Sequence, residues 1–307
     1  MEVSAIASWA WIPIVVWAAF AQTIRNAAQR SLVGDMGTLG ATLVRFLYGL
    51  PFAGAWLLLV LVFIAPDSHL PALQLNYLLW LVLGAACQLG ATACLLVAMK
   101  QRNFIVGVAF SKTEVLQVGI FATLILQEIP TWLSALAMVV STVGVVMLSL
   151  PGRLDGKGLQ GGGSAAWIGL ASGALFALSS VGYRGAALEL PAVSPWLIGG
   201  LNVLLAQLMQ SVALGAWLAW RQPAVLPAIA RAWKLSTVAG MMGALASIGW
   251  LTAMALRPAV DVRTLGLVEV LFSYLVSRRM FREKVSRNEL IGLLLVGAGV
   301  LVVSAQF

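Results

Sequence analysis

Apolar residues dominate ten stretches of this chain, and short polar segments separate each stretch from the next. A helix needs about 20 mainly apolar residues to cross the hydrocarbon core of a bilayer. The pattern therefore predicts an all-α integral membrane protein with ten transmembrane helices. The expected helices lie near residues 8–27, 38–64, 76–98, 104–126, 131–150, 165–187, 195–219, 234–256, 260–280 and 286–305.

Composition argues against a soluble domain and against an enzyme site. Hydrophobic residues make up 61% of the chain and charged residues 10%, whereas soluble domains carry about 25% charged residues. The connections are short and offer no convincing nucleophile–base pair. His69 is the only histidine, and Cys87 and Cys94 are seven residues apart on one helix face, too far to form a disulfide. We expect no enzyme activity, no catalytic residue, no metal and no cofactor.

The first apolar stretch is expected to remain in the mature chain. Ala19-Phe20-Ala21 has the small residues of a cleavage site, but Glu2 is the only charged residue before this stretch. A secretory signal carries basic residues at that position. We therefore interpret the stretch as a transmembrane helix.

The basic residues indicate an orientation in the membrane. The net charge is +8, and fourteen of the nineteen basic residues follow odd-numbered expected helices. Lys and Arg gather in cytoplasmic loops, so we predict that both termini are periplasmic, in a bacterial-type inner (plasma) membrane. This placement argues against a nucleic-acid partner. The fourteen are Arg25, Arg30, Lys100, Arg102, Arg153, Lys157, Arg221, Arg231, Lys234, Arg278, Arg279, Arg282, Lys284 and Arg287, whereas Arg184, Arg257 and Arg263 lie on the other side.

The second half of the chain repeats the first at a shift of 155 residues, which places Glu114-Val115-Leu116 on Glu269-Val270-Leu271. We expect a first repeat at 1–150, a Gly-rich linker at 151–164 and a second repeat at 165–307. Each repeat would contain five helices. Because five is odd, the second repeat would lie upside-down relative to the first, as in many transporters.

The repeated segments resemble a known family. Glu114–Ser149 and Glu269–Ser304 each contain an acidic residue within an apolar span, then a span that ends around a glycine. Two such copies over ten helices resemble the EamA domain of the drug/metabolite transporter superfamily. The resemblance covers nearly the whole chain. It implies export more often than import, with amino acids, amino-acid-derived compounds (including opine-type metallophores) and drugs among the substrates. Many ten-helix members are described with cytoplasmic termini, and here the charge bias predicts the reverse.

Four charged residues inside expected helices are candidates for substrate or proton binding: Glu114, Glu269, Arg45 and Lys112. A charged side chain at a helix centre costs about 2.5–3.5 kcal/mol on insertion scales. Carboxylates that bind protons would serve proton coupling, and carboxylates near bases would form a polar site for a zwitterion. The structural alternative is a static ion pair, and both bases also have the alternative of extending toward a membrane surface.

Other polar residues are placed to line the same cavity. Ser111, Glu114 and Gln117 recur every three residues and form one polar stripe. Polar residues inside spans also hold helices together, so each is a candidate for either role. The remaining candidates are Gln22, Asn26, Gln88, Tyr183, Ser247 and Trp250.

Two further repeated acids, Glu128 and Glu283, are interpreted as structural. Each lies just before the last span of its repeat and is followed by Thr131 or Ser286, whose hydroxyls are suited to cap a helix. The glycines of those last spans are expected to let helices approach closely. They are Gly144, Gly292, Gly297 and Gly299.

These patterns together predict a secondary transporter that exports a small amphipathic metabolite by alternating access, with protons as the candidate coupling ion. Its expected partners are the substrate and the lipid bilayer, and a homodimer stays open. Two alternatives remain at this point. One is a sugar, nucleotide-sugar or multidrug carrier of the same fold, and the other is a membrane scaffold or sensor without flux.

The topology is directly testable with reporter fusions. Alkaline phosphatase fused after Phe307 is expected to be active, because the charge bias places the C-terminus in the periplasm. The control is a fusion after Arg231, which follows the seventh expected helix and should be inactive. An inactive Phe307 fusion with an active Arg231 fusion would reverse the predicted orientation.

Overall fold

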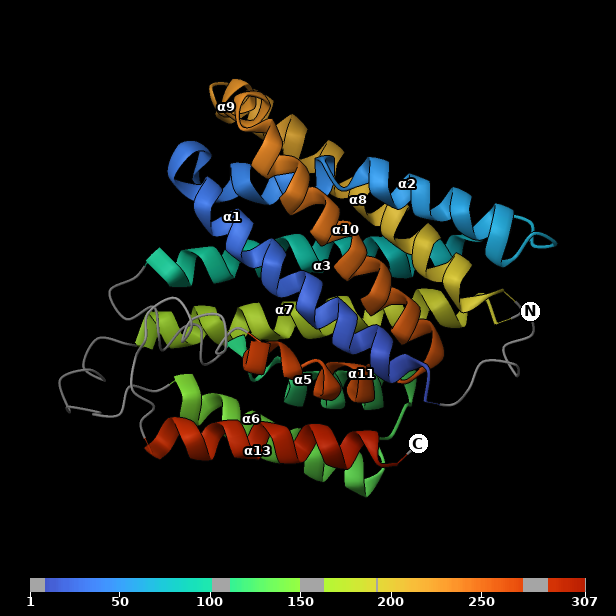
Figure 1. Cartoon of the computed structure of the whole chain (residues 1–307), viewed down its shortest axis with the longest axis vertical. Coiled ribbons are helices and arrows are strands. Elements are labelled where there is room, and N and C mark those ends of the chain that lie inside the picture. The colour runs from blue at the N-terminus through green and yellow to red at the C-terminus, as the bar shows by residue number, and fades with distance from the viewer. Residues whose placement is uncertain (1–8, 101–110, 150–162, 192, 273–286, 307) are drawn as a thin grey trace. The chain divides into compact units, whose positions relative to one another are not determined.

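The computed structural model describes residues 9–100, 111–149, 163–191, 193–272 and 287–306 (Figure 1). Throughout these ranges the regular structure is helical, with eleven α-helices and two short π-helical segments. The prediction of an all-α fold is confirmed. The arrangement as ten helices in two inverted repeats stays a prediction.

The helices follow one another along the chain with short connections. Their order is α1 (Trp11–Leu47), α2 (Leu50–Leu59), η2 (Val60–Ile64), α3 (Leu75–Lys100), α5 (Glu114–Phe121), η3 (Ala122–Leu126), α6 (Trp132–Ser149), α7 (Gly163–Leu188), α8 (Pro195–Arg221), α9 (Val225–Arg231), α10 (Trp233–Leu256), α11 (Ala259–Leu265) and α13 (Arg287–Ser304).

Four described helical segments are long and apolar enough to cross a membrane, which indicates a multi-pass membrane protein. They are Ser31–Ile64, Leu75–Leu95, Pro195–Arg221 and Trp233–Leu256. Three shorter apolar helical segments accompany them in the described ranges, at Glu114–Leu126, Trp132–Leu148 and Leu290–Ser304.

Six helices agree closely with the apolar pattern, and two of the differences elsewhere have clear reasons. α3, α6, α7, α8, α10 and α13 begin and end within two residues of the expected limits. α1 runs through the first expected helix and into the second, with a break only at Gly37, where φ is 71° and ψ is 177°, and α2 and η2 form the rest of the second expected helix. Glycine adopts this conformation at little cost because it has no Cβ. The short helix α9 was not expected, because it lies outside the long apolar runs.

The chain forms two compact units. The first contains residues 1–86 and 182–257, and the second contains residues 87–181 and 258–307. Each unit therefore combines segments from both halves of the sequence, and the division falls inside α3 and α7. The predicted boundaries at 1–150 and 165–307 describe the sequence repeat, which spatial contacts do not test.

In the first unit α1 lies beside α10 (Figure 1), and the two helices touch closely at Gly249. A Cβ at Gly249 would lie 2.8 Å from the Cβ of Ala18. Buried polar groups connect other helices of this unit. The Tyr77 hydroxyl donates to Asn202 Oδ1 at 2.7 Å, and Gln210 Nε2 donates to the Ala85 carbonyl at 3.1 Å. Small residues and buried hydrogen bonds of this kind are the usual means of holding membrane helices together.

In the second unit α6 and α13 pack side by side (Figure 1). A Cβ at Gly144 would lie 2.7 Å from the Gly292 carbonyl oxygen and 2.8 Å from the Val296 nitrogen. The close approach predicted for these glycines is thus confirmed at Gly144 and Gly292, and also at Gly299, which meets Ser141. It is wrong at Gly297, where a Cβ would meet open space.

The predicted cap of α6 is present. The backbone N–H of Ser134 donates to Thr131 Oγ1 at 3.1 Å, which satisfies one of the unpaired donors at the start of the helix. The equivalent Ser286 and the repeated Glu283 lie outside the described residues.

Substituting Gly144 by Ala is expected to lower the thermal stability of the purified protein, because the added methyl group would press on backbone atoms of α13. Overpacking of this kind costs about 1–3 kcal/mol. Gly297→Ala is the matched control on the partner helix and should be neutral or slightly stabilising. Equal melting temperatures for Gly144→Ala and Gly297→Ala in detergent would contradict this packing.

Candidate functional site

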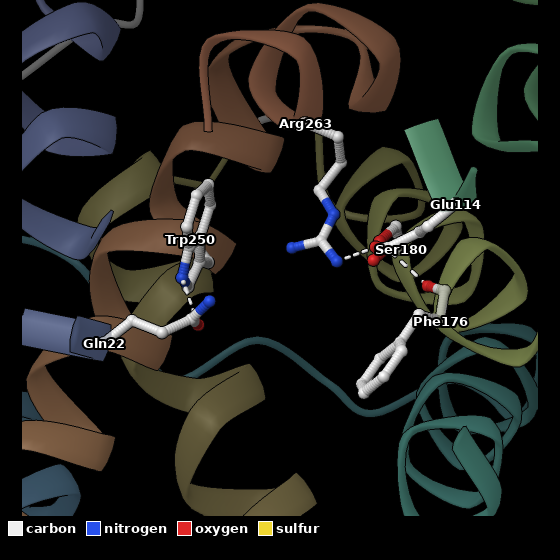
Figure 2. A network of polar contacts seen from close by, with 6 residues as sticks. All are labelled: Gln22, Glu114, Phe176, Ser180, Trp250 and Arg263. Carbon is white, nitrogen blue, oxygen red and sulfur yellow. Dashed lines mark hydrogen bonds and ion pairs between the residues drawn. The ribbon is translucent and has the colours of Figure 1, made fainter. Parts of the chain in front are cut away.

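Glu114 forms an ion pair with Arg263 in the second unit. Glu114 is the first residue of α5, and Arg263 belongs to α11. Figure 2 shows the Arg263 guanidinium directed at the Glu114 carboxylate. The side chain of Glu114 is only 14% exposed, and that of Arg263 is 16% exposed. The pair therefore lies mainly inside an apolar helical unit, where each charge needs the other.

Both repeated glutamates follow a break in their helix. Two turn residues, Lys112 and Thr113, precede Glu114, and two others, Gly266 and Leu267, come just before the helical stretch that contains Glu269. The backbone N–H of Glu269 donates to the Gly266 carbonyl at 3.0 Å, a tighter pattern than that of a regular α-helix. The two glutamates that are equivalent in the sequence repeat therefore also follow similar breaks in the helical backbone. Glu269 is half-buried.

The polar stripe predicted around Glu114 lies against α7. Gln117 Nε2 donates to Thr113 Oγ1 at 3.0 Å and to the Leu170 carbonyl at 3.5 Å. A Cβ at Gly173 would lie 3.0 Å from the Ser111 carbonyl oxygen and 3.1 Å from Gln117 Nε2. Glycine at position 173 therefore lets α7 approach the polar segment closely.

The other two candidates of this unit, Lys112 and Gln88, are both half-buried. Lys112 directly precedes Thr113 at the helix break. Gln88 lies in α3, and its backbone carbonyl accepts a hydrogen bond from the Thr92 hydroxyl at 2.8 Å. This hydrogen bond of the Gln88 backbone lies within α3.

In the first unit two candidates are hydrogen-bonded to each other. Trp250 Nε1 donates to Gln22 Oε1 at 3.0 Å, and Figure 2 shows this contact between α10 and α1. Ser247 lies about one turn before Trp250 on α10 and is half-buried.

Tyr183 is 3% exposed and packs its ring on Gly84, where a Cβ would lie 2.9 Å from the ring. Tyr183 therefore acts in the packing of α7 on α3.

Arg45 and Asn26 lie in α1, with Arg25 beside Asn26 in the sequence. Arg45 is 8% exposed and lies over the ring of Phe46, 5.1 Å from its centroid. Because Arg45 is buried, its side chain does not extend to the surface in this structure, which was one of the alternatives for this residue. Asn26 is exposed, and its Oδ1 accepts hydrogen bonds from Arg25 Nε at 3.2 Å and Nη2 at 2.7 Å.

Sequence reasoning missed four charged residues that are buried or mostly buried, among them Arg184, which was placed in a loop but is 9% exposed inside α7. Arg25 and Arg263 were counted among loop residues, yet Arg25 is 5% exposed inside α1. Asp261 was not singled out, although it is 6% exposed and accepts a hydrogen bond from Ser134 Oγ at 2.7 Å. The available signal was position: Asp261 and Arg263 lie within the expected ninth helix, and Arg25 lies within the first.

The first unit also has a pocket that lies apart from these candidates. A pocket of about 270 Å³ in the first unit is lined mainly by apolar groups, among them Trp17, Trp56 and Trp196, and it lies on the face of α10 opposite to Ser247 and Trp250. In the described ranges no group of three or more His, Cys, Asp or Glu residues could hold a metal ion.

Comparison with solved structures supports the fold alone. A structure described only as "Crystal structure of protein" is similar to this chain with a TM-score of 0.71 and 16% sequence identity, and the match covers 95% of each chain. No protein-family model matches the chain. No curated protein matches it either.

The Glu114–Arg263 pair can be tested by a double-mutant cycle. Glu114→Gln and Arg263→Gln should each lower the melting temperature, because each leaves one charge without its partner. The double variant should recover part of the loss, with a coupling of about 1–3 kcal/mol. Asp67→Asn, an exposed loop change, should be additive with Arg263→Gln. Additivity in both cycles would exclude a direct energetic interaction.

Proposed function

We propose that the protein is a secondary transporter of the drug/metabolite type, with ten helices in two inverted repeats, which exports a small amphipathic metabolite by alternating access. The observation that carries the proposal is the partly buried Glu114–Arg263 pair directly after a helix break. The same kind of break precedes Glu269, the repeat counterpart of Glu114.

Broken helices and intramembrane charges have a common use in transporters. A break exposes backbone groups and places a charged side chain where a substrate or coupling ion can reach it. Because such residues are costly in an apolar interior, their presence is a functional hypothesis by default. The repeated acidic motif and its resemblance to the EamA pattern support the same class of protein.

The pair also supplies a chemical step for the cycle. A proton on Glu114 would neutralise the carboxylate and weaken its attraction to Arg263. An ammonium group of a substrate would compete with Arg263 for the same carboxylate. Either event changes the pairing inside the second unit, and substrate release would restore it. Amino acids and amino-acid-derived compounds, including opine-type metallophores, carry the required ammonium or amine groups. Sugar, nucleotide-sugar and multidrug substrates are the alternatives.

A second candidate function follows from the same ion pair. A static pair would hold α5 and α11 together without taking part in flux, as in a membrane scaffold or sensor. The two functions differ in one measurable property, since only a transporter moves a solute across a sealed membrane.

Glu114→Gln and Glu269→Gln are each expected to abolish or uncouple transport while expression is retained. The purified protein is reconstituted in proteoliposomes, candidate amino acids are supplied, and uptake and internal pH are recorded. Glu128→Gln is the matched control, because it removes a carboxylate from the same repeat motif at a loop position and should keep flux. Wild-type flux in both Glu114→Gln and Glu269→Gln would refute the proposed role of the pair, and no wild-type flux with any substrate would favour the scaffold.

A further inference from the structure

Tryptophans and basic residues are concentrated at one end of the first unit, where α8 leads through α9 into α10 (Figure 1). Two of the helical segments that could cross a membrane, Pro195–Arg221 and Trp233–Leu256, end and begin at this point. The short helix α9 forms the connection between them. When both segments span a bilayer, this connection lies at the level of the lipid headgroups.

The tryptophans at this end are exposed. Trp217 and Trp220 of α8 are 40% and 73% exposed, and Trp233 of α10 is 56% exposed. An indole ring has an apolar body that suits lipid tails and an N–H group that suits headgroups, so tryptophan is enriched at the membrane interface. The three rings therefore indicate that both helix ends lie at this depth.

Three exposed basic residues accompany these tryptophans, namely Arg221, Arg231 and Lys234. The Arg221 guanidinium lies over the Trp220 ring, 4.1 Å from its centroid. The Lys234 ammonium lies 5.8 Å from the centroid of the Trp233 ring. Two of the three positive charges are thus placed beside an interfacial ring, at the depth where a lipid has its phosphate group.

The charge around this end favours an anionic partner. Residues 190–260 contain no Asp or Glu. α1, which packs on α9, carries one exposed acid, Asp35, five residues before Gly40. The three bases outnumber this acid, and each base near the surface of an anionic membrane is attracted by it.

Packing on the rest of the unit holds α9 in place. A Cβ at Gly40 of α1 would lie 2.7 Å from Val225 Cγ1, and the Tyr48 hydroxyl donates to the Ile229 carbonyl at 3.4 Å. Ile229 is 4% exposed, whereas Arg231 at the end of the same short helix is exposed. α9 is therefore anchored by its apolar residues and leaves Arg231 accessible to a headgroup.

We propose that Arg221, Arg231 and Lys234 form a surface that binds the phosphate group of an anionic phospholipid, with the tryptophans of α8 and α10 beside its acyl chains. Arginine forms charge-assisted hydrogen bonds with phosphate oxygens, and lysine attracts phosphate as a point charge. The tryptophans suit any phospholipid, whereas the three bases distinguish an anionic headgroup from a zwitterionic one. Lipid binding at this surface does not require that the protein is a transporter.

Binding is tested on the purified full-length protein in a neutral detergent, titrated with phosphatidylglycerol and in parallel with phosphatidylcholine. Phosphatidylglycerol should raise the melting temperature in a saturable manner, since a ligand that binds only the folded state stabilises it. Phosphatidylcholine should have a smaller effect. Arg221→Gln, Arg231→Gln and Lys234→Gln should each weaken the apparent affinity for phosphatidylglycerol about fivefold, the share of one basic residue at an anionic surface.

Arg257→Gln is the matched control. It removes one positive charge from the same unit, but Arg257 follows the opposite end of α10, about 36 Å away along this helix. The affinity of this variant for phosphatidylglycerol should equal that of the wild type. Because the three bases of the surface are exposed, their substitution should change the melting temperature without lipid by little, so a loss of affinity would not reflect a loss of folding.

The other outcomes would overturn the lipid surface. Equal stabilisation by phosphatidylglycerol and phosphatidylcholine, or an equal loss of affinity in Arg257→Gln, would show that the three bases do not select the headgroup. Inorganic phosphate is added in a separate titration, and stabilisation as large as that by phosphatidylglycerol would assign the surface to a soluble anion. Glu114→Gln should retain the effect of phosphatidylglycerol, so a failure of the transport proposal would leave this surface intact.

Discussion

A charged group inside an apolar helical unit is stable only beside a suitable partner, and much of the described polar structure follows from this constraint. Glu114 lies beside Arg263, and the Asp261 carboxylate accepts a hydrogen bond from Ser134. Arg184 Nη1 donates to the Met254 carbonyl at 2.7 Å, where the last carbonyls of α10 have no partner within the helix. Arg184 thus finds its partner at a helix end, because backbone carbonyls are free only there.

Glycine supplies the second constraint, since close contacts decide which polar groups can meet. At Gly144 the missing side chain brings two backbones together, which gives packing without chemistry. At Gly173 and Gly243 the same property brings a helix against polar side chains, Gln117 in one case and two arginines in the other. The same residue type thus has different consequences, which depend on whether a backbone or a side chain lies opposite the glycine.

The sequence predicted the helices well because long apolar runs have few alternatives in a membrane. Their pairing was harder to predict. The polar stripe at Ser111 and Gln117 was evident from spacing, but Arg263 as the partner of Glu114 was not, because the two residues are far apart in the chain. The break at Gly37 and the short helix α9 also depend on local backbone geometry that apolar periodicity does not describe. The pairing of Gln22 with Trp250 joins two predicted candidates, although neither spacing nor composition indicated it.

Buried arginines also change how the charge bias should be weighed. The orientation rule counts basic residues that lie in loops or near helix ends at the membrane surface. Arg25 is buried within α1, Arg263 is mostly buried in an ion pair, and Arg184 is 9% exposed and bonded to backbone carbonyls. These residues are held by the protein rather than by the cytoplasmic surface, so they carry little information on orientation. Among the described basic residues that follow odd-numbered expected helices, Arg221, Arg231 and Lys234 are exposed, so these are the ones that the orientation rule can count.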